Sequence, residues 1–364
     1  MENILNSNSI LTILEFILAL GFILLLHELG HFLVGRLFKV KIEEFGIGYP
    51  PRLLKLFTWK ETLFSLNWIP FGGFCRFKGE GDPAVKGGLA AANKWVRLGT
   101  LSAGSITNLL LATLLFAVVI AQYGIPQTNI VQIREIAINS PAENAGLIPG
   151  DVIKQFNNDA INSVDELINL TQLSLGKEVT LLINRNGSDL IIKLTPRKDP
   201  PQGEGPIGVL LGNPMQTVSV IQAIPSGFQT TIDMGKQLLT IPILLLRGEV
   251  DPSQMRLLSP KGIYDIYSQV RDAELQAENY TPQMGLINFI SFFAVISAAL
   301  GFSNLLPIPA LDGGRLLFLM PEILFNRRVP AKYENMVHFI GFSVLILIMI
   351  YVFIQDFINP IVLP

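Results

Sequence analysis

The sequence predicts a polytopic α-helical membrane protein with four transmembrane helices, a re-entrant or cytoplasmic β-loop and one inserted extracytoplasmic α+β domain. Three observations predict this class. Half of the 364 residues are hydrophobic and 15% are charged, whereas about a quarter of the residues in soluble domains are charged. Four apolar stretches are long enough to cross a bilayer. A more polar segment with short strand and helix patterns separates the second stretch from the third.

The four apolar stretches contain few ionisable groups. They are residues 10–26, 101–121, 284–306 and 337–354, and their acidic, basic and histidine side chains are Glu15 in the first and His338 in the fourth. We expect the first stretch to continue through His31 and to be retained, because no Lys or Arg precedes it and no small-residue cleavage site follows it. We interpret His338 as an incidental residue at the membrane interface.

Loop charges predict the orientation of the chain. Residues 34–98 hold eleven Lys and Arg against five Asp and Glu, and the short connection 312–335 holds four Lys and Arg. The two tails outside the apolar stretches hold none. Because loops rich in Lys and Arg stay in the cytoplasm, we expect both connections inside the cell and both tails outside. The long segment 122–283 is then extracytoplasmic.

The first apolar stretch leads into the motif HELGH, from His27 to His31. Residues four apart lie on one face of a helix, so both imidazoles can reach the same metal ion. Glu28 lies about 100° further round the helix, near that ion but free of it. In H-E-x-x-H motifs two histidines bind zinc and the glutamate acts as general base on zinc-bound water. A pair of helix-end histidines is the alternative, but polar groups in a span are costly and favour a functional reading.

Two segments after this helix are rich in glycine and aromatic residues. EFGIGYPP, residues 44–51, is interpreted as a turn because glycines and prolines interrupt it. TLFSLNWIPFGGFCRF, residues 62–77, alternates and is rich in β-formers, which predicts a β-hairpin or a re-entrant β-loop. Such backbone is tolerated at membrane depth only where protein or a water-filled cavity covers it. An ordinary cytoplasmic hairpin is the alternative.

The second apolar stretch includes AGSITN, residues 103–108, near its start. Gly104 and Ser105 allow a neighbouring helix to pack closely. Asn108 lies a turn or two inside the cytoplasmic end of this span. Its amide has three candidate roles: a hydrogen bond between helices, a contact with the backbone of a substrate, or the orientation of a metal ligand. The sequence does not separate these roles.

The third apolar stretch ends in NLLPIPALDGG, from Asn304 to Gly314. The prolines end the helix, and the glycine pair allows close approach of the backbone. Asp312 is either the cap of a helix that starts at Arg315 or the third ligand of a zinc ion, since catalytic zinc usually has three protein ligands and an open position. The predicted orientation brings this motif, HELGH and Asn108 to the same, cytoplasmic side.

The long segment between the second and third stretches contains a compact module at residues 127–198. Strand patterns, an amphipathic helix and a hairpin signal at Asn186-Gly187 follow one another. The SPA of residues 140–142, the AGL of 145–147 and the GDVI of 150–153 resemble the pattern of a bacterial PDZ domain. PDZ domains bind extended peptides, including peptide C-termini, by adding a strand to a sheet edge. A spacer without a ligand is the alternative.

Residues 199–283 are expected to form a linker and interfacial amphipathic helices. The stretch 218–246 is apolar but contains two prolines and two charged residues, too many breaks for a fifth span. The predicted organisation is therefore the first two spans with HELGH and the β-loop at 1–126, the PDZ-like module, this linker, and the last two spans with LDGG at 284–364. The net charge of −2 gives no reason to expect nucleic acid binding.

HELGH in the first span, the PDZ-like module and NLLPIPALDGG together resemble the site-2 protease family of intramembrane zinc metalloproteases, most closely its bacterial regulator-of-sigma-E protease branch. The resemblance implies a zinc ion held by His27, His31 and Asp312, with Glu28 as catalytic base. It also implies a multi-pass protein of the bacterial inner membrane. Its substrates would be single-span membrane proteins, such as anti-sigma factors and remnant signal peptides, cleaved by regulated intramembrane proteolysis.

The resemblance further implies a platform for the substrate strand at the β-loop and a gate or size filter in the PDZ-like module. The candidate substrate-binding residues are Phe71, Gly72, Gly73, Asn108 and Asn304. Ser105 stands where the second-span motif of the family often has proline. Two other functions are considered: a catalytically silent membrane scaffold with a PDZ domain, and a metal transporter. The complete HELGH motif argues against the scaffold, and the lack of an internal sequence repeat argues against the transporter.

Overall fold

The computed structural model describes residues 7–249 and 256–363. The chain folds into two compact units. Unit 1 comprises the residues up to 119 and those from 224 onward, and unit 2 comprises residues 120–223. Unit 1 contains long helices and a β-hairpin, whereas unit 2 is built on a sheet.

Within the described residues, four helices are long and apolar enough to cross a membrane. They are α1 (Ser7–Leu37), α2 (Lys94–Tyr123), α7 (Pro282–Leu305) and α9 (Ala331–Ile358). Each covers one of the predicted apolar stretches, so the prediction of four candidate spans is confirmed. Each is longer than the roughly 20 residues that cross a hydrocarbon core.

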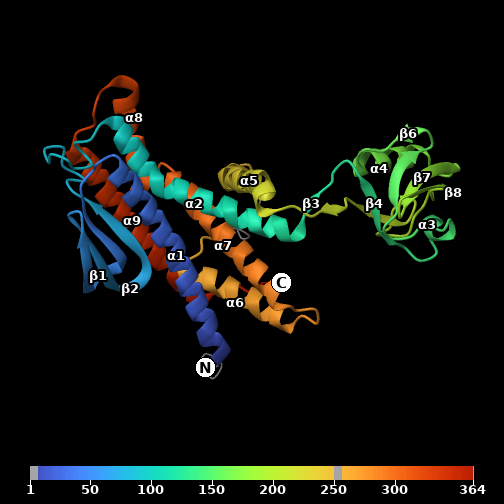
Figure 1. Cartoon of the computed structure of the whole chain (residues 1–364), viewed down its shortest axis with the longest axis horizontal. Coiled ribbons are helices and arrows are strands. Elements are labelled where there is room, and N and C mark those ends of the chain that lie inside the picture. Colours follow the sequence, from blue (N-terminus) through green and yellow to red (C-terminus); the bar gives the residue numbers. More distant parts are fainter. Residues whose placement is uncertain (1–6, 250–255, 364) are drawn as a thin grey trace. The chain divides into compact units, whose positions relative to one another are not determined.

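Residues 42–77 form a hairpin of two long strands, β1 (Ile42–Trp59) and β2 (Thr62–Phe77). Both strands bend, so the register lays four segments side by side in the order 73–77, 42–47, 62–67 and 52–59. The turn predicted at 44–51 is confirmed in part: 42–47 runs parallel to 62–67 and 52–59 runs antiparallel to it, so the chain reverses between residues 47 and 52 while its backbone stays paired as part of β1. A second reversal, at Lys60 and Glu61, joins β1 to β2. The hairpin lies along α1 (Figure 1).

Glycines set the distance between the hairpin and α1. A Cβ at Gly72 would lie 3.0 Å from Cβ of Leu24, and one at Gly21 would lie 3.3 Å from the carbonyl oxygen of Pro70. Gly72 also has a φ of +83°, which glycine adopts without steric cost. The bend of β2 therefore lies against the helix one turn before Glu28.

Three further helices are α5 (Val220–Leu246), α6 (Pro260–Gln276) and α8 (Asp312–Phe325). α5 is one continuous helix, and Gly227 lets it pack on α2, since a Cβ there would lie 2.5 Å from the carbonyl oxygen of Thr113. α6 packs against α1, where the hydroxyl of Tyr267 donates a hydrogen bond of 3.1 Å to Glu15. The charged group of the first span therefore has a polar partner.

Unit 2 is built on a sheet of six strands in the order β8, β7, β5, β4, β9, with β6 paired to β5. The strands are β4 (Val131–Ile136), β5 (Val152–Phe156), β6 (Asp159–Ala160), β7 (Val179–Arg185), β8 (Ser188–Leu194) and β9 (Val209–Gly212), with helices α3 (Pro141–Asn144) and α4 (Val164–Leu173). The short strands β3 (Ile125–Pro126) and β10 (Met215–Gln216) pair with each other. The predicted hairpin at Asn186-Gly187 is confirmed as the turn between β7 and β8.

Unit 2 has its own hydrophobic core and extends past the boundary predicted at residue 198. Ile133, Ile153, Leu167 and Ile183 lie in this core and are at most 2% exposed. β9, which falls within the predicted linker, pairs with β4 and forms one edge of the sheet. Unit 2 therefore continues past residue 198, because β9 is needed to complete its sheet.

Candidate functional site

Three of the predicted site residues meet where α1 approaches the start of α8. Nε2 of His27 and Nε2 of His31 are 3.2 Å apart. Each of these nitrogens lies 3.2 Å from Oδ2 of Asp312. The two histidines are 7% and 6% exposed. The three atoms form a nearly equilateral triangle that is largely shielded by protein.

The triangle fits a tetrahedral zinc ion. Histidine nitrogens and carboxylate oxygens bind zinc at about 2.0 to 2.2 Å, which places neighbouring ligand atoms about 3.3 to 3.6 Å apart. The observed separations of 3.2 Å are close to that length. Oδ2 of Asp312 is buried without a hydrogen-bond donor among the described residues, as expected of an atom that binds a metal. Two imidazoles and one carboxylate are a donor set typical of catalytic zinc.

Gly104 of α2 makes room for this triangle. A Cβ at Gly104 would lie 2.6 Å from Nε2 of His27 and closer still to Nε2 of His31. Any side chain at this position would therefore occupy the space beside both ligand nitrogens. The sequence indicated only close helix packing at Gly104, and the structure shows which atoms it approaches.

The rings of both histidines have neighbours on α2 at Nδ1. Nδ1 of His31 donates to the carbonyl oxygen of Thr100 at 2.7 Å, which leaves Nε2 free to bind a metal. The amide nitrogen of Asn108 lies 3.5 Å from Nδ1 of His27. Asn108 is 0% exposed. An amide nitrogen is a donor, whereas Nδ1 of His27 carries a proton and needs an acceptor when Nε2 binds a metal, so this contact leaves the three roles of Asn108 open.

Glu28 is turned toward the hairpin. Its Oε2 accepts a hydrogen bond of 2.9 Å from the backbone N–H of Cys75. Cys75 belongs to the segment 73–77, which lies at one edge of the four-segment sheet. Glu28 therefore stands between the histidines and a strand edge. A carboxylate in this place can take up or deliver a proton.

The loop between α7 and α8 directs Asp312 to the histidines. Leu311 is the N-cap of α8 and has no side-chain capping bond, so the alternative role of Asp312 as a helix cap is not realised. Gly313 lets the loop fold tightly, because a Cβ there would overlap the carbonyl oxygens of Leu305 and Leu306. The carboxylate of Asp312 is thereby presented from the first turn of α8.

The candidate substrate-binding residues lie on separate elements. Gly72 and Gly73 form the bend of β2 against α1. The backbone of Phe71 belongs to β2, and its side chain lies outside the part of the chain that the structure describes. Asn304, near the end of α7, is half-buried, and its amide has no hydrogen-bond partner within the described residues.

The role of His338 was not foreseen. Its interpretation as an incidental interfacial residue is wrong, because Nδ1 of His338 accepts a hydrogen bond of 3.1 Å from the backbone N–H of Ala310. Ala310 lies two residues before Asp312. The signal in the sequence was the cost of a histidine in an apolar span. That cost predicts a polar partner but does not identify it.

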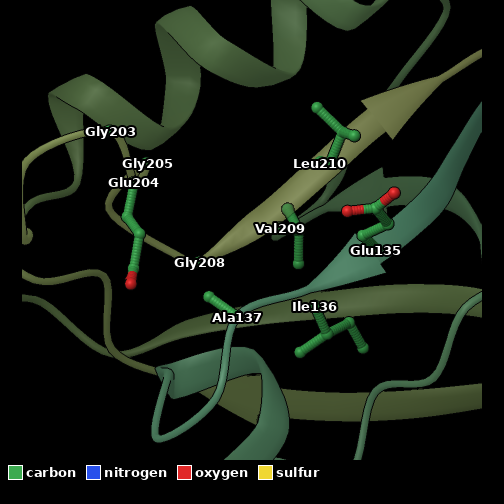
Figure 2. Close-up of a pocket in the computed structure, with 9 residues that line it drawn as sticks. All are labelled: Glu135, Ile136, Ala137, Gly203, Glu204, Gly205, Gly208, Val209 and Leu210. Carbon is green, nitrogen blue, oxygen red and sulfur yellow. The ribbon is translucent and has the colours of Figure 1, made fainter.

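Unit 2 offers a separate concave surface. A pocket of about 270 Å³ lies between β4, β9 and the loop 203–208 (Figure 2). A smaller groove of about 70 Å³ lies between the same loop and α4. Within the described residues β9 pairs only with β4, so its other edge is open. An open strand edge beside a groove is a surface to which an extended peptide can add.

Comparison with known proteins gives matches over almost the whole chain. The sequence profile of Peptidase family M50 matches residues 15–348, which include HELGH and Asp312. A candidate zinc metalloprotease of Clostridium acetobutylicum is 31% identical, over 95% of this chain and 97% of that protein. The regulator of sigma-W protease RasP of Bacillus subtilis is 27% identical, over 95% of this chain and 98% of that protein. The zinc metalloprotease RasP of Oceanobacillus iheyensis is 27% identical with the same shares covered.

Proposed function

The chain belongs to peptidase family M50 and is a zinc metalloprotease, and from this premise we propose that it cleaves single-span membrane proteins in or near their transmembrane segments. One observation carries the proposal. The triangle of donor atoms includes two histidines of a helix that is apolar enough to cross a membrane. A peptidase centre built on such a helix acts on peptide bonds at or near membrane depth.

We assign His27, His31 and Asp312 as the residues that hold zinc. A zinc ion held there would lower the pKa of its bound water to about 7 and would polarise the scissile carbonyl. Glu28 takes up the proton of the attacking water and delivers it to the leaving amine. The hydrogen bond from Cys75 holds one oxygen of this carboxylate and leaves the other for proton transfer.

The segment 73–77 is the proposed platform for the substrate. A helical substrate shields its amides with its own hydrogen bonds, so it must unwind before hydrolysis. An unwound strand can then add to a sheet edge through main-chain hydrogen bonds. Cys75 lies at this edge and contacts Glu28, which supports the assignment. The residues proposed to contact substrate are Phe71, Gly72, Gly73, Asn108 and Asn304.

The proposed location is the bacterial cell (inner) membrane, with several spans. The excess of Lys and Arg in 34–98 and 312–335 supports a cytoplasmic position for both connections. The candidate active site then lies near the cytoplasmic face. Unit 2 lies outside the cytoplasm in this arrangement.

Anti-sigma factors and remnant signal peptides are the proposed substrates, cleaved by regulated intramembrane proteolysis. The relative that is named for regulation of sigma-W supports the first class. We propose that unit 2 is a PDZ domain that binds peptide C-termini at the open edge of β9 or excludes substrates with large external domains. The order of its strands and the groove beside α4 support this assignment.

A pair of substrates in proteoliposomes tests the proposal. Both contain the same transmembrane segment, and one carries a short external tail while the other carries a large folded external domain. We expect cleavage of the short version in or near the span, located by mass spectrometry, and resistance of the long version. Cleavage restricted to soluble peptides would contradict an intramembrane site. Binding of both versions without cleavage of either would favour the alternative, a catalytically silent PDZ scaffold.

A further inference from the structure

The loop from Leu306 to Leu311 joins α7 to the helix that begins with Asp312. Its two prolines have no N–H to donate. Three of the other N–H groups find acceptors nearby: Leu306 donates to Ser303, Ile308 to Leu306, and Leu311 to Ile308. The N–H of Ala310 instead donates to Nδ1 of His338 on α9, at 3.1 Å. His338 therefore completes the backbone hydrogen bonding of this loop from outside it.

Ala310 has an unusual backbone conformation. Its φ is +84°, in the left-handed region that residues with a Cβ rarely adopt. Such conformations persist only where the surrounding structure holds them. The hydrogen bond from Ala310 to His338 is an external restraint at this position. It acts two residues before Asp312.

The face of α9 that includes His338 packs against the loop from Leu306 to Leu311. Most of the apolar part of α9 is exposed in the structure, although the end of the helix is held where Asp356 accepts a hydrogen bond from the backbone N–H of Ser259. Gly341 lies one turn after His338, and a Cβ there would overlap Cβ of Pro309. The ring of His338 also lies 5.5 Å from the ring of Phe318 in α8. One turn of α9 thus contacts both the loop and the helix that follow α7.

The histidine ring makes a single polar contact. Because Nδ1 accepts a hydrogen bond, the proton of the neutral ring is on Nε2. Nε2 is buried and has no partner within the described residues. A phenylalanine ring at this position would avoid the cost of a polar group in an apolar helix. The feature that distinguishes histidine from phenylalanine here is the acceptor at Nδ1.

We infer that His338 is a positioning residue, which fixes the backbone of Ala310 and thereby holds the carboxylate of Asp312 beside His27 and His31. The inference rests on the proposed zinc site. His338 does not touch the three donor atoms. It acts through the loop that presents one of them.

Two substitutions separate the acceptor from the ring. His338→Asn keeps an acceptor at the place of Nδ1 and loses the ring, whereas His338→Phe keeps the ring and loses the acceptor. Zinc affinity of the full-length protein is measured by competition with a chelator. We expect the zinc affinity of the His338→Phe variant to be about 10- to 100-fold lower, by analogy with outer-shell partners of metal ligands. The zinc affinity of the His338→Asn variant should stay within about threefold of the wild type. Hydrogen exchange in residues 306–314 should be faster in the Phe variant.

A third substitution tests the link to the backbone. Ala310→Gly removes the steric cost of the positive φ. When it is combined with His338→Phe, we expect it to recover part of the lost zinc affinity. In the wild-type background it should leave zinc affinity nearly unchanged.

A folded Phe variant with wild-type zinc affinity overturns the inference. An Asn variant that loses as much affinity as Phe also overturns it, because packing of the ring is then what matters. If the Phe variant fails to fold, as judged by circular dichroism and size-exclusion chromatography, the Asn variant decides by itself, and a loss of tenfold or more contradicts the acceptor role. Failure of the folded wild type to bind zinc would refute the proposed site rather than the role of His338.

Discussion

The backbone nitrogen of Cys75 and Oε2 of Glu28 are 2.9 Å apart and form a hydrogen bond between β2 and α1. The proposed catalytic base is thus held by the strand edge that is proposed to bind substrate. This contact requires β2 to lie close to the helix, which the glycine at position 72 permits. The position of the base therefore depends on the hairpin as well as on its own helix.

The length of the Glu28 side chain should matter. Glu28→Asp is one methylene shorter, so its carboxylate cannot keep the bond to Cys75 and also reach the attacking water. We expect kcat to fall by about 100-fold or more, within the range of general acid–base effects, while zinc content stays the same. Steady-state cleavage of a model substrate and zinc analysis of the same sample measure this. A variant with near wild-type kcat would show that the base is not held in this way.

Gly104 should be required for metal binding. In Gly104→Ala the added Cβ would lie 2.6 Å from Nε2 of His27, so the histidines must move apart. We expect this variant to lose most of its zinc, as measured by elemental analysis of purified protein. Gly99→Ala is the matched control on the same helix, because its Cβ would lie 3.1 Å from Cε2 of Phe38 and 3.9 Å from Cγ1 of Val34, away from both ligand nitrogens. Equal zinc content in the two variants would contradict the role of Gly104.

Asn304 should act on substrate and not on the metal. Its amide has no hydrogen-bond partner within the described residues, so it is free to bind a peptide backbone. We expect Asn304→Ala to lower kcat/KM by about 3- to 10-fold, the effect of one lost hydrogen bond, with normal zinc affinity. Ser303→Ala serves as a neighbouring control. A loss of zinc in the Asn304 variant would instead place the residue in the metal centre.

Unit 2 contains a buried ion pair that predicts acid sensitivity. Asp151 is 0% exposed, and its two oxygens accept hydrogen bonds of 2.8 and 2.7 Å from Arg185. Burial tends to raise the pKa of Asp151, but the bonds from Arg185 and from the N–H of Ile148 outweigh it and hold the pKa below its ordinary value. The contribution of Asp151 to stability is complete above the unfolded pKa of about 3.9. It is lost as the pH falls through the lower folded pKa.

Hydrogen exchange of the full-length protein between pH 7 and pH 3, corrected for intrinsic rates, measures this acid sensitivity. We expect protection in β5 and β7 to fall at the acid end in the wild type. Asp151→Asn should be less stable at pH 7 and should show a weaker dependence on pH. The same pH dependence in both proteins would mean that other groups control the acid response of unit 2.

Most residues of the candidate metal site could be predicted from local sequence motifs. The spacing of His27 and His31 is read directly from helix geometry, because residues four apart share a face whatever the rest of the chain does. Asp312 could be proposed from its chemistry and its place at the end of an apolar stretch. Its alternative role as a helix cap was settled only by the direction of its side chain, which depends on the tertiary fold.

Features that depend on distant partners could not be predicted. The glycines and prolines of 44–51 predicted a turn, and the chain does reverse there, but the strand segments on either side of it are defined only by their pairing with β2. β9 was assigned to a linker because four residues give little local signal, and only its pairing with β4 defines it. The bond from Ala310 to His338 joins residues 28 positions apart. No local rule connects them.

One measurement tests the assigned chemistry most directly: cleavage of a membrane-embedded single-span substrate by purified wild type and Glu28→Gln, with zinc content determined for both. Gln can still accept the hydrogen bond from Cys75, but it cannot take up a proton. We expect about one zinc per chain in both proteins and a rate lower by about 10²- to 10⁴-fold in the variant. Equal cleavage by both proteins would contradict the assignment of Glu28, and a folded wild type without zinc would contradict the metal centre.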